Sequence, residues 1–205
     1  LLLGPIHARA EQTKLRISLQ QSITAHLGQN LLQFKKQAEA RSDGAIAVEI
    51  YDDSKLYTDN EAAGAVASGA IEMATITYQQ LTRKVPAVGI FEQPFLFNSE
   101  ALVRAAVHPD SEMRQLIDRA ILEATGIRVL WWQSYGFSVF YSKARDVQHP
   151  SGIRNQKVRV FGDNMARFVR YCDGTAFLIS ASKQHQAVKD GTVDMTMSGI
   201  TTVGP

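Results

Sequence analysis

Arg159 is the residue of this chain whose type and position most clearly point to chemistry. It lies in the run Lys157-Val158-Arg159-Val160, where alternation along a strand directs the two valines to one side and the arginine to the other. Gly162 and Asp163 then open a helix. An arginine at the carboxyl end of a strand, beside a helix N-terminus, can hold an anion, and its planar guanidinium matches a carboxylate. Arg159 therefore suggests either a carboxylate-binding site or an ion pair with a neighbouring acid.

Sequence motifs for nucleotide binding, nucleophilic catalysis and metal binding are missing. The chain has no G-x-G-x-x-G, no P-loop and no G-x-S-x-G, and its five histidines form no H-x-x-x-H pattern. Asp52, Asp53 and Asp59 lack the spacing of a calcium loop, so we interpret them as turn and cap residues. His185 has no neighbour in sequence that would orient it as a base. We therefore expect no catalytic residue, no metal and no cofactor.

The composition is that of an ordinary globular protein. The 205 residues suffice for one large domain or two small ones, and 45% of them are hydrophobic against 20% charged. A net charge of +2 is too small to favour a nucleic-acid partner. Cys172 is the single cysteine, so an intrachain disulfide is excluded.

The first ten residues suggest export. The run Leu1-Leu2-Leu3-Gly4-Pro5 is followed by Ala8-Arg9-Ala10, which is typical of the end of a secretory signal: an apolar stretch, a helix breaker and a small-x-small cleavage site. The alternative is a disordered tail. No other apolar run approaches the roughly 18 residues that span a bilayer. We expect an exported protein whose mature part begins near Glu11.

The hydrophobic pattern predicts strands that alternate with helices. In the first half, strands are expected at 14–20, 45–51 and 71–77, with helices that begin at Ser22 or Thr24 and at Thr58 or Asp59. This order predicts an α/β fold with a parallel sheet. Residues 85–98 resemble a packed connector. The later expected strands are 127–133, 137–142, 158–161, 176–179 and 193–198, and the later expected helices are 99–107, 110–125, 163–172 and 182–189.

Two distant segments, 65–76 and 187–198, have similar sequences. Each has the pattern of a helix end, a glycine (Gly69 or Gly191) that allows positive φ, and a short strand with an acid near its start. The repetition predicts two lobes of similar α/β construction. Because ligands of open α/β sheets bind beyond the carboxyl ends of strands, we expect the two segments to form facing walls of one cleft.

At this point the chain resembles a known family, from about residue 14 to residue 201. It is similar to the extracytoplasmic solute-binding subunits of TRAP (tripartite ATP-independent periplasmic) transporters, of the type that binds dicarboxylates and other organic acids. The resemblance rests on these blocks in order: Ser42-Asp43-Gly44, Ser54-Lys55-Leu56, Ser68-Gly69-Ala70-Ile71-Glu72-Met73, Phe91-Glu92-Gln93-Pro94-Phe95-Leu96-Phe97, Ser142-Lys143, Lys157-Val158-Arg159-Val160 and Asp190-Gly191-Thr192-Val193-Asp194.

The resemblance implies a periplasmic-binding-protein-like fold of two lobes, each with a mostly parallel sheet flanked by helices, and a ligand cleft between them. We expect a signal-peptide remnant at 1–10, lobe I at 11–130 and lobe II at 131–205. Lobe II is expected to be incomplete at its C-terminus, since family members continue past the strand that ends near Ser198. The implied function is capture of an organic acid in the periplasm and its delivery to the membrane subunits of a TRAP transporter.

The resemblance also implies roles for individual residues. Arg159 falls on the arginine that clamps a carboxylate in the family, and Gln20 on a position that offers a side-chain amide to the ligand. Gly162 falls where the ligand approaches the backbone. Ser198 stands where many members place an asparagine that bonds the carboxylate; a hydroxyl can still donate, with shorter reach.

Two further regions are expected to contact the ligand. Thr77 and Tyr78 match the end of a strand where the family makes ligand contacts. Many members carry a second arginine where this chain has Ser138, so a grip by two arginines on a dicarboxylate is in doubt. Phe137 or Tyr135 is expected to face the cleft instead. Our hypothesis is a ligand with one clamped carboxylate and a less charged, aromatic or branched remainder.

Two other functions stay open from the sequence. The same cleft could serve a ligand-sensing module that acts on a receptor. Less favoured is an enzyme on a two-lobe α/β scaffold, since catalytic residues can assemble from distant parts of a chain.

Overall fold

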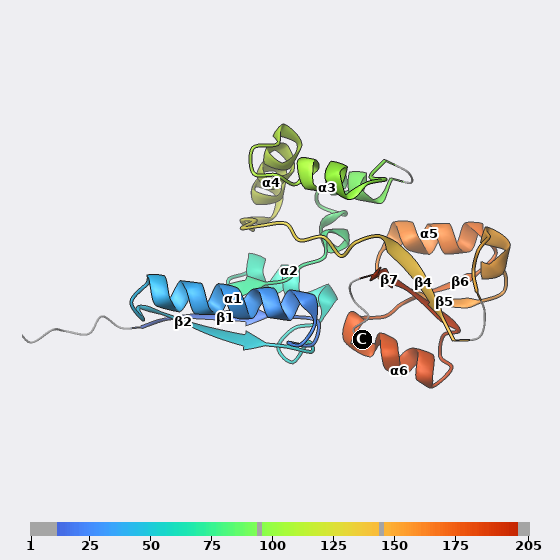
Figure 1. The fold of residues 1–205 in the computed structure, drawn as a ribbon, viewed down its shortest axis with the longest axis horizontal. Helices are drawn as coiled ribbons and strands as arrows, with labels where there is room; N and C mark the ends of the chain where they lie inside the picture. Colours follow the sequence, from blue (N-terminus) through green and yellow to red (C-terminus); the bar gives the residue numbers. More distant parts are fainter. Residues whose placement is uncertain (1–11, 94–95, 144–145, 201–205) are drawn as a thin grey trace, which may run out of the picture.

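The computed structural model describes residues 12–93, 96–143 and 146–200 (Figure 1). The predicted signal-peptide remnant at 1–10 lies outside these residues. Figure 1 shows two α/β lobes side by side, with helices α3 and α4 above the first lobe and an irregular segment that crosses to the second. Within the described ranges, no helix combines the length and apolar character needed to cross a membrane.

The first lobe is built on a fully parallel sheet, as its sequence predicts. Strands β1 (Thr13–Ser18), β2 (Ile46–Tyr51) and β3 (Met73–Ala74) lie in the order β2-β1-β3. In register, Ile17 of β1 faces Ile50 on one side and Met73 on the other. The third strand is shorter than the expected 71–77, because Thr75 bonds through its backbone to Ser18 and through its side chain to Gln20, and the chain then turns away.

Helices α1 (His26–Arg41) and α2 (Asp59–Ala67) connect these strands. Helix α1 buries Leu27 and Leu31 against the sheet. Its predicted cap is wrong: Ser22 and Thr24 bond to each other at 2.9 Å, and Ala25 is the N-cap without a side-chain bond. At α2 the predicted start is confirmed, because Thr58 and Glu61 form a reciprocal capping box.

A helical region links the two sheets. It contains the 3₁₀ segments η1 (Tyr78–Leu81) and η2 (Pro86–Glu92) and the helices α3 (Glu100–Ala106) and α4 (Glu112–Thr125). As expected, α4 ends at Gly126, whose φ is 74°. The buried core of this helical region consists of Leu81, Val85, Val88, Ile117, Ile121 and Ile127.

The strand expected at 127–133 is absent. This stretch is extended but pairs with no strand among the described residues, and it runs from α4 toward the second lobe (Figure 1). Its large rings pack on side chains instead of facing a neighbouring strand. Trp131 lies 5.4 Å from Phe34 and Trp132 lies 5.3 Å from Phe91, measured between ring centroids. Aromatic and β-branched residues favour a strand, but only where a partner strand is available.

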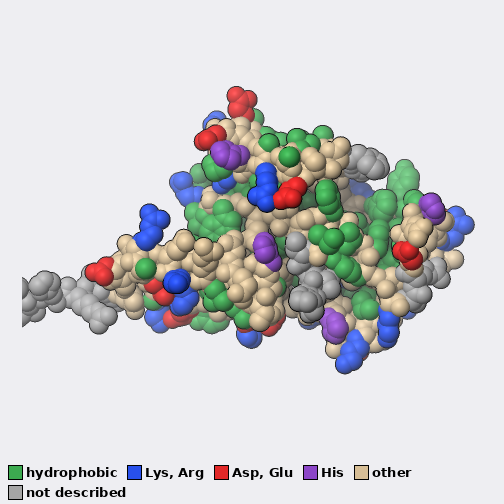
Figure 2. Space-filling model, in the orientation of Figure 1, with side chains coloured by type: hydrophobic (Ala, Val, Ile, Leu, Met, Phe, Trp, Pro, Cys, Tyr) green, Lys and Arg blue, Asp and Glu red, His purple; other side chains and the backbone are tan. Residues whose placement is uncertain are grey.

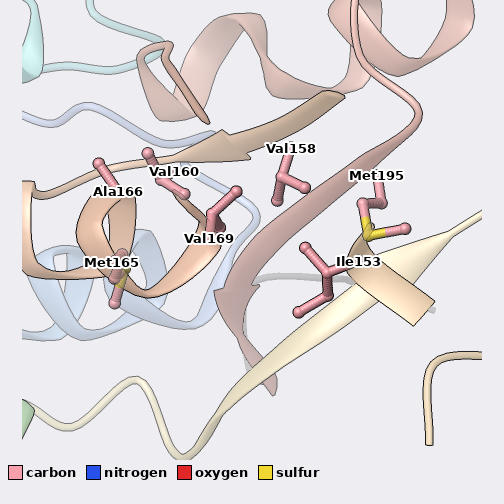
Figure 3. Packing of buried hydrophobic residues seen from close by; sticks show 7 residues of the cluster. All are labelled: Ile153, Val158, Val160, Met165, Ala166, Val169 and Met195. Carbon is pink, nitrogen blue, oxygen red and sulfur yellow. The ribbon is translucent and has the colours of Figure 1, made fainter. Parts of the chain in front are cut away.

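The second lobe has a mostly parallel sheet. Strands β4 (Ser138–Ser142), β5 (Lys157–Val160), β6 (Thr175–Leu178) and β7 (Met195–Gly199) lie in the order β4-β7-β5-β6, and only the β4–β7 pair is antiparallel. Between them lie α5 (Asp163–Tyr171), α6 (Gln184–Lys189), and the 3₁₀ turns η3 (Pro150–Ile153) and η4 (Ala181–Lys183). The core is a cluster of Ile153, Val158, Val160, Met165, Ala166, Val169 and Met195 (Figure 3).

The repetition seen in the sequence is confirmed in the structure. Helix α2 ends at Ala67 and α6 ends at Lys189, each two residues before a glycine with positive φ: 75° at Gly69 and 72° at Gly191. Each glycine leads into a strand, β3 or β7. The two lobes therefore use the same helix–glycine–strand unit, and the α/β fold class is confirmed.

Charged side chains are scattered on the face shown in Figure 2, with basic and acidic groups interspersed. Among the described residues, no group of three or more His, Cys, Asp or Glu side chains is placed to hold a metal ion.

Candidate functional site

Arg159 is the largest side chain that is fully buried in the described part of the chain, with 2% of its surface exposed. It lies on β5 between Phe177 of β6 and Thr196 of β7. Because β5 is flanked by strands on both sides and by helices on its faces, very little of the Arg159 side chain reaches solvent. The alternation that the sequence indicates is thus present, but both faces of the strand are covered.

The hydrogen bonds of Arg159 all go to neutral acceptors. Its Nε donates to the carbonyl of Ile179 at 2.7 Å, and Nη1 donates to Gln184 Oε1 at 3.0 Å and to the carbonyl of Met197 at 3.2 Å. Among the described residues, no acceptor is recorded for Nη2 and no ion pair for the guanidinium. Of the two alternatives from the sequence, the structure therefore lacks the ion pair, and it leaves one edge of the guanidinium for another acceptor.

Burial shapes the electrostatics of Arg159. Removal from water lowers the pKa of the guanidinium to about 10, against the opposing effect of Asp59 and Tyr135. A pKa near 10 still leaves the group charged at neutral pH. A buried, charged guanidinium whose hydrogen bonds all go to neutral groups can take an anionic acceptor at its remaining edge.

Asp59 approaches this site from the first lobe. It is the first residue of α2, and its Oδ2 accepts a hydrogen bond of 2.9 Å from the backbone N–H of Ala181 in the second lobe. Burial raises the pKa of Asp59, while the nearby charge of Arg159 lowers it. The two lobes therefore meet in a seam that contains a cation from one side and an acid from the other.

Tyr135, on the irregular segment between α4 and β4, also lies at this seam. Burial raises the pKa of its phenol, and it interacts with the charges of both Asp59 and Arg159. Gly199 of β7 packs directly against it: a Cβ added at Gly199 would lie 2.5 Å from Tyr135 Cβ. The glycine therefore allows the close approach that seats the tyrosine.

Gln20 and Thr77 lie at the carboxyl ends of neighbouring strands in the first lobe. The Oε1 atom of Gln20 accepts from Thr75 Oγ1 at 2.6 Å, which directs Nε2 away from this bond. Gln20 Nε2 and Thr77 Oγ1 are both buried, and neither has a hydrogen-bond partner among the described residues. Figure 1 shows this sheet directed toward the second lobe. Unpaired buried polar atoms are rare and require an explanation, such as a ligand that completes them.

Two more of the expected site residues take part in packing. Tyr78 opens η1 and stacks on Phe91 at 5.6 Å between ring centroids, and burial raises the pKa of its phenol. Gly162, the N-cap of α5, is buried against Gln79, whose Cγ would lie 2.7 Å from an added Cβ. Gly162 therefore lies at a close contact between the two lobes.

The last three expected site residues lie on the second lobe and the approach to it. Ser198 is 5% exposed on β7, opposite Val139 of β4. Ser138 opens β4 and is exposed, and Phe137 before it is 53% exposed. The structure thus buries Ser198 in the sheet and leaves the other two side chains accessible. Their ligand contacts stay predictions.

Sequence reasoning missed the roles of Asp59 and Gln184. Asp59 was expected only as a cap, and its reach to Ala181 joins residues 122 positions apart, which no local pattern reveals. Gln184 accepts from Arg159 because it is the first residue of α6, one turn after β6. Asp59 lies outside the repeated segments 65–76 and 187–198, so the repeat gives no signal for this contact.

A second polar contact joins the lobes. Asn164 of α5 donates to Glu92 Oε2 at the end of η2, and Arg83 lies 3.9 Å from Asp163. Burial raises the pKa of Glu92, whose Oε1 is buried and has no hydrogen-bond partner within 12–93, 96–143 and 146–200. This contact holds α5 against the first lobe.

Two open hollows of about 530 and 430 Å³ lie elsewhere, over β4 and beside β2. Neither is lined by Arg159, Asp59 or Gln20. We place the candidate site at the seam because the buried charges and unpaired polar atoms lie there, whereas the hollows are shallow surface features.

Two α/β lobes that meet around a buried cation define the class of two-lobed binding-protein folds. Residues 18–204 match the family of bacterial extracellular solute-binding proteins, family 7, and the chain belongs to this family. A solute-binding protein of Verminephrobacter eiseniae (strain EF01-2) is 28% identical over 189 residues, which are 90% of this chain and 55% of that protein. The chain spans about half the length of the curated relatives that it matches.

Solved structures show the same fold. A TRAP periplasmic solute-binding protein from Sulfurospirillum deleyianum with bound succinate aligns with a TM-score of 0.85 at 20% identity, over 93% of this chain and 61% of that one. Another, from a Polaromonas species with bound D-erythronate, aligns with a TM-score of 0.84 at 21% identity, over 93% of this chain and 62% of that one. The family match confirms the expected membership among extracellular solute-binding proteins, and the solved structures confirm the two-lobed fold.

Proposed function

We propose that this chain captures an organic acid at the seam between its lobes and presents it to the membrane subunits of a TRAP-type transporter in the periplasm. The observation that carries the proposal is the buried guanidinium of Arg159, with three bonds to neutral acceptors and one edge left over. The ligand carboxylate would take that edge as a charge-assisted acceptor.

The opposite wall supplies the remaining contacts in this proposal. Gln20 Nε2 can donate to a ligand oxygen, and the Thr77 hydroxyl can donate or accept. Their lack of any partner within the described residues supports a ligand role, since each would otherwise lose a hydrogen bond on leaving water. Gly162 and Ser198 fit beside Arg159 as backbone and hydroxyl contacts.

Arg159 alone is too weak for this task. A charge-assisted hydrogen bond contributes roughly 1.5–3 kcal/mol net, and micromolar affinity requires about 8 kcal/mol. Several contacts must therefore form together, from both lobes. Closure of the lobes would bring them together and exclude water, which strengthens the bond to the guanidinium.

The relatives support the ligand class. The protein from Sulfurospirillum deleyianum holds succinate and the one from the Polaromonas species holds D-erythronate, both small acids with a carboxylate. A binding role without turnover agrees with the family description, which is that of solute-binding proteins.

A thermal-shift screen of the 205-residue chain against small carboxylic acids tests this function. We expect at least one acid to raise the Tm in a concentration-dependent way, because a ligand that binds only the folded state stabilises it. The matching neutral amides should have no effect, and mass spectrometry of the acid after incubation should show it unchanged. A Tm that responds to none of the acids, or conversion of an acid to product, would contradict the proposal.

A further inference from the structure

Asp59 and Arg159 hold the same short turn of the second lobe. Arg159 Nε donates to the carbonyl of Ile179, and Asp59 Oδ2 accepts from the N–H of Ala181, two residues further on. The guanidinium and the carboxylate are therefore neighbours on one backbone turn, yet no ion pair between them is recorded.

The charge balance of the seam follows from these two residues. Among the described residues, Asp59 and Tyr135 are the ionisable groups that act on Arg159, and no second cation does so. One positive and one negative charge sum to zero. A monocarboxylate adds one negative charge beside the guanidinium, whereas a dicarboxylate adds a second negative charge at a seam that already holds an aspartate.

We propose that Asp59 is a specificity-determining residue that favours hydroxylated monocarboxylates over dicarboxylates. This inference rests on the proposed function. A second ligand carboxylate near Asp59 would be repelled, and such built-in repulsion is how binding sites reject close analogues. A hydroxyl can instead donate to the Asp59 carboxylate, and another can accept from Gln20 Nε2, which has no partner among the described residues.

The test compares two four-carbon acids by isothermal titration calorimetry. Succinate carries two carboxylates, and D-erythronate carries one carboxylate and three hydroxyls. We expect the 205-residue chain to bind D-erythronate at least tenfold more tightly than succinate. In Asp59→Asn, which leaves the capping box of Thr58 and Glu61 in place, the ratio of the two affinities should fall at least tenfold, mainly through tighter binding of succinate.

The control variant is Glu112→Gln. Glu112 is also an acid at the first position of a helix, but it is exposed on α4 and lies away from the seam. It should leave the ratio unchanged. A ligand-side measurement needs no variant: succinamate, in which one carboxylate of succinate becomes an amide, should bind the unmodified chain at least tenfold more tightly than succinate.

The outcomes separate this inference from the proposed function. If both acids bind but succinate is the tighter ligand, or if Asp59→Asn leaves the ratio unchanged, the specificity role is wrong while the binding function stands. If neither these acids nor any other carboxylate binds, the proposed function fails and the inference fails with it.

Discussion

The ion pair of Arg16 and Glu72 holds together β1 and β3, the strands that lead to Gln20 and Thr77. Arg16 donates to the Glu72 carboxylate through its backbone N–H at 2.9 Å, through Nε at 2.9 Å and through Nη2 at 2.6 Å. Strand β3 pairs with β1 over only two residues, Met73 and Ala74. The side-chain pair therefore replaces ladder bonds that a longer strand would supply.

The contribution of the Arg16–Glu72 pair to the free energy of unfolding follows from the pKa of Glu72. Hydrogen bonding to Arg16 lowers that pKa from 4.5 to about 2, which corresponds to an upper limit of about 3.4 kcal/mol. The side chains of Arg16 and Glu72 are 38% and 36% exposed. Solvent screening therefore reduces the expected contribution to about 1 kcal/mol.

Urea unfolding of Glu72→Gln as a function of pH measures this contribution. Because folding lowers the pKa of the carboxyl, its stabilisation is complete above pH 4.5 and is lost as the pH falls toward about 2. The variant should have a free energy of unfolding about 1 kcal/mol below that of the parent at pH 7, and the difference should fall to less than half of that at pH 3.

A matched control is Glu100→Gln, which breaks the exposed pair with Arg104 on α3 and should cost less than Glu72→Gln at pH 7. A loss for Glu72→Gln that is equal at pH 7 and pH 3, or absent at pH 7, would refute the reasoning.

Two further predictions concern packing. Leu31→Ala should lower the free energy of unfolding by about 2–5 kcal/mol, because Leu31 is 1% exposed in the core of the first lobe. Leu32→Ala, at a position that is 40% exposed, should lower it by less than about 1 kcal/mol. Urea unfolding compares the two variants, and equal losses would contradict the assigned core. Gly199→Ala should lower both the Tm and the affinity for a bound acid, because the new Cβ displaces Tyr135 from the seam; unchanged affinity in calorimetry would show that Tyr135 is not needed there.

Local patterns were sufficient to predict much of the fold. The alternation of strand and helix, the helix stop at Gly126 and the positive φ at Gly69 and Gly191 all depend on residues close in sequence, and each is confirmed. The repeated helix–glycine–strand unit predicted two lobes for the same reason. Backbone conformation at a glycine is a local property, and hydrophobic periodicity reports which face of an element is buried.

The sequence predictions are wrong where contacts between residues far apart in the chain determine the local structure. The stretch at 127–133 has the composition of a strand, but Trp131 and Trp132 pack on rings of the first lobe and no partner strand adjoins them. At α1, Ser22 and Thr24 bond to each other and leave the helix without the predicted cap. Propensity states what a segment can form, and tertiary packing selects among the possibilities.

The candidate site could likewise be predicted from the sequence only in part. The position of Arg159 on a strand before a helix is visible in the sequence, and the resemblance to a family added Gln20, Thr77 and Gly162. Its acidic neighbour was not visible, because the contact between Asp59 and Ala181 depends on how the lobes meet. The neutral character of the arginine's partners is likewise a property of the folded lobe.

The central claim is that the guanidinium fork of Arg159 binds the carboxylate of the ligand. Arg159→Ala would leave a cavity and unpaired carbonyls in a buried place, so Arg159→Lys is the sharper variant: it keeps the charge and loses the fork. Isothermal titration calorimetry with an acid identified in the thermal-shift screen should show at least tenfold weaker binding to Arg159→Lys, with an unchanged circular dichroism spectrum. Binding of that acid to Arg159→Lys with the affinity of the parent chain would contradict the account.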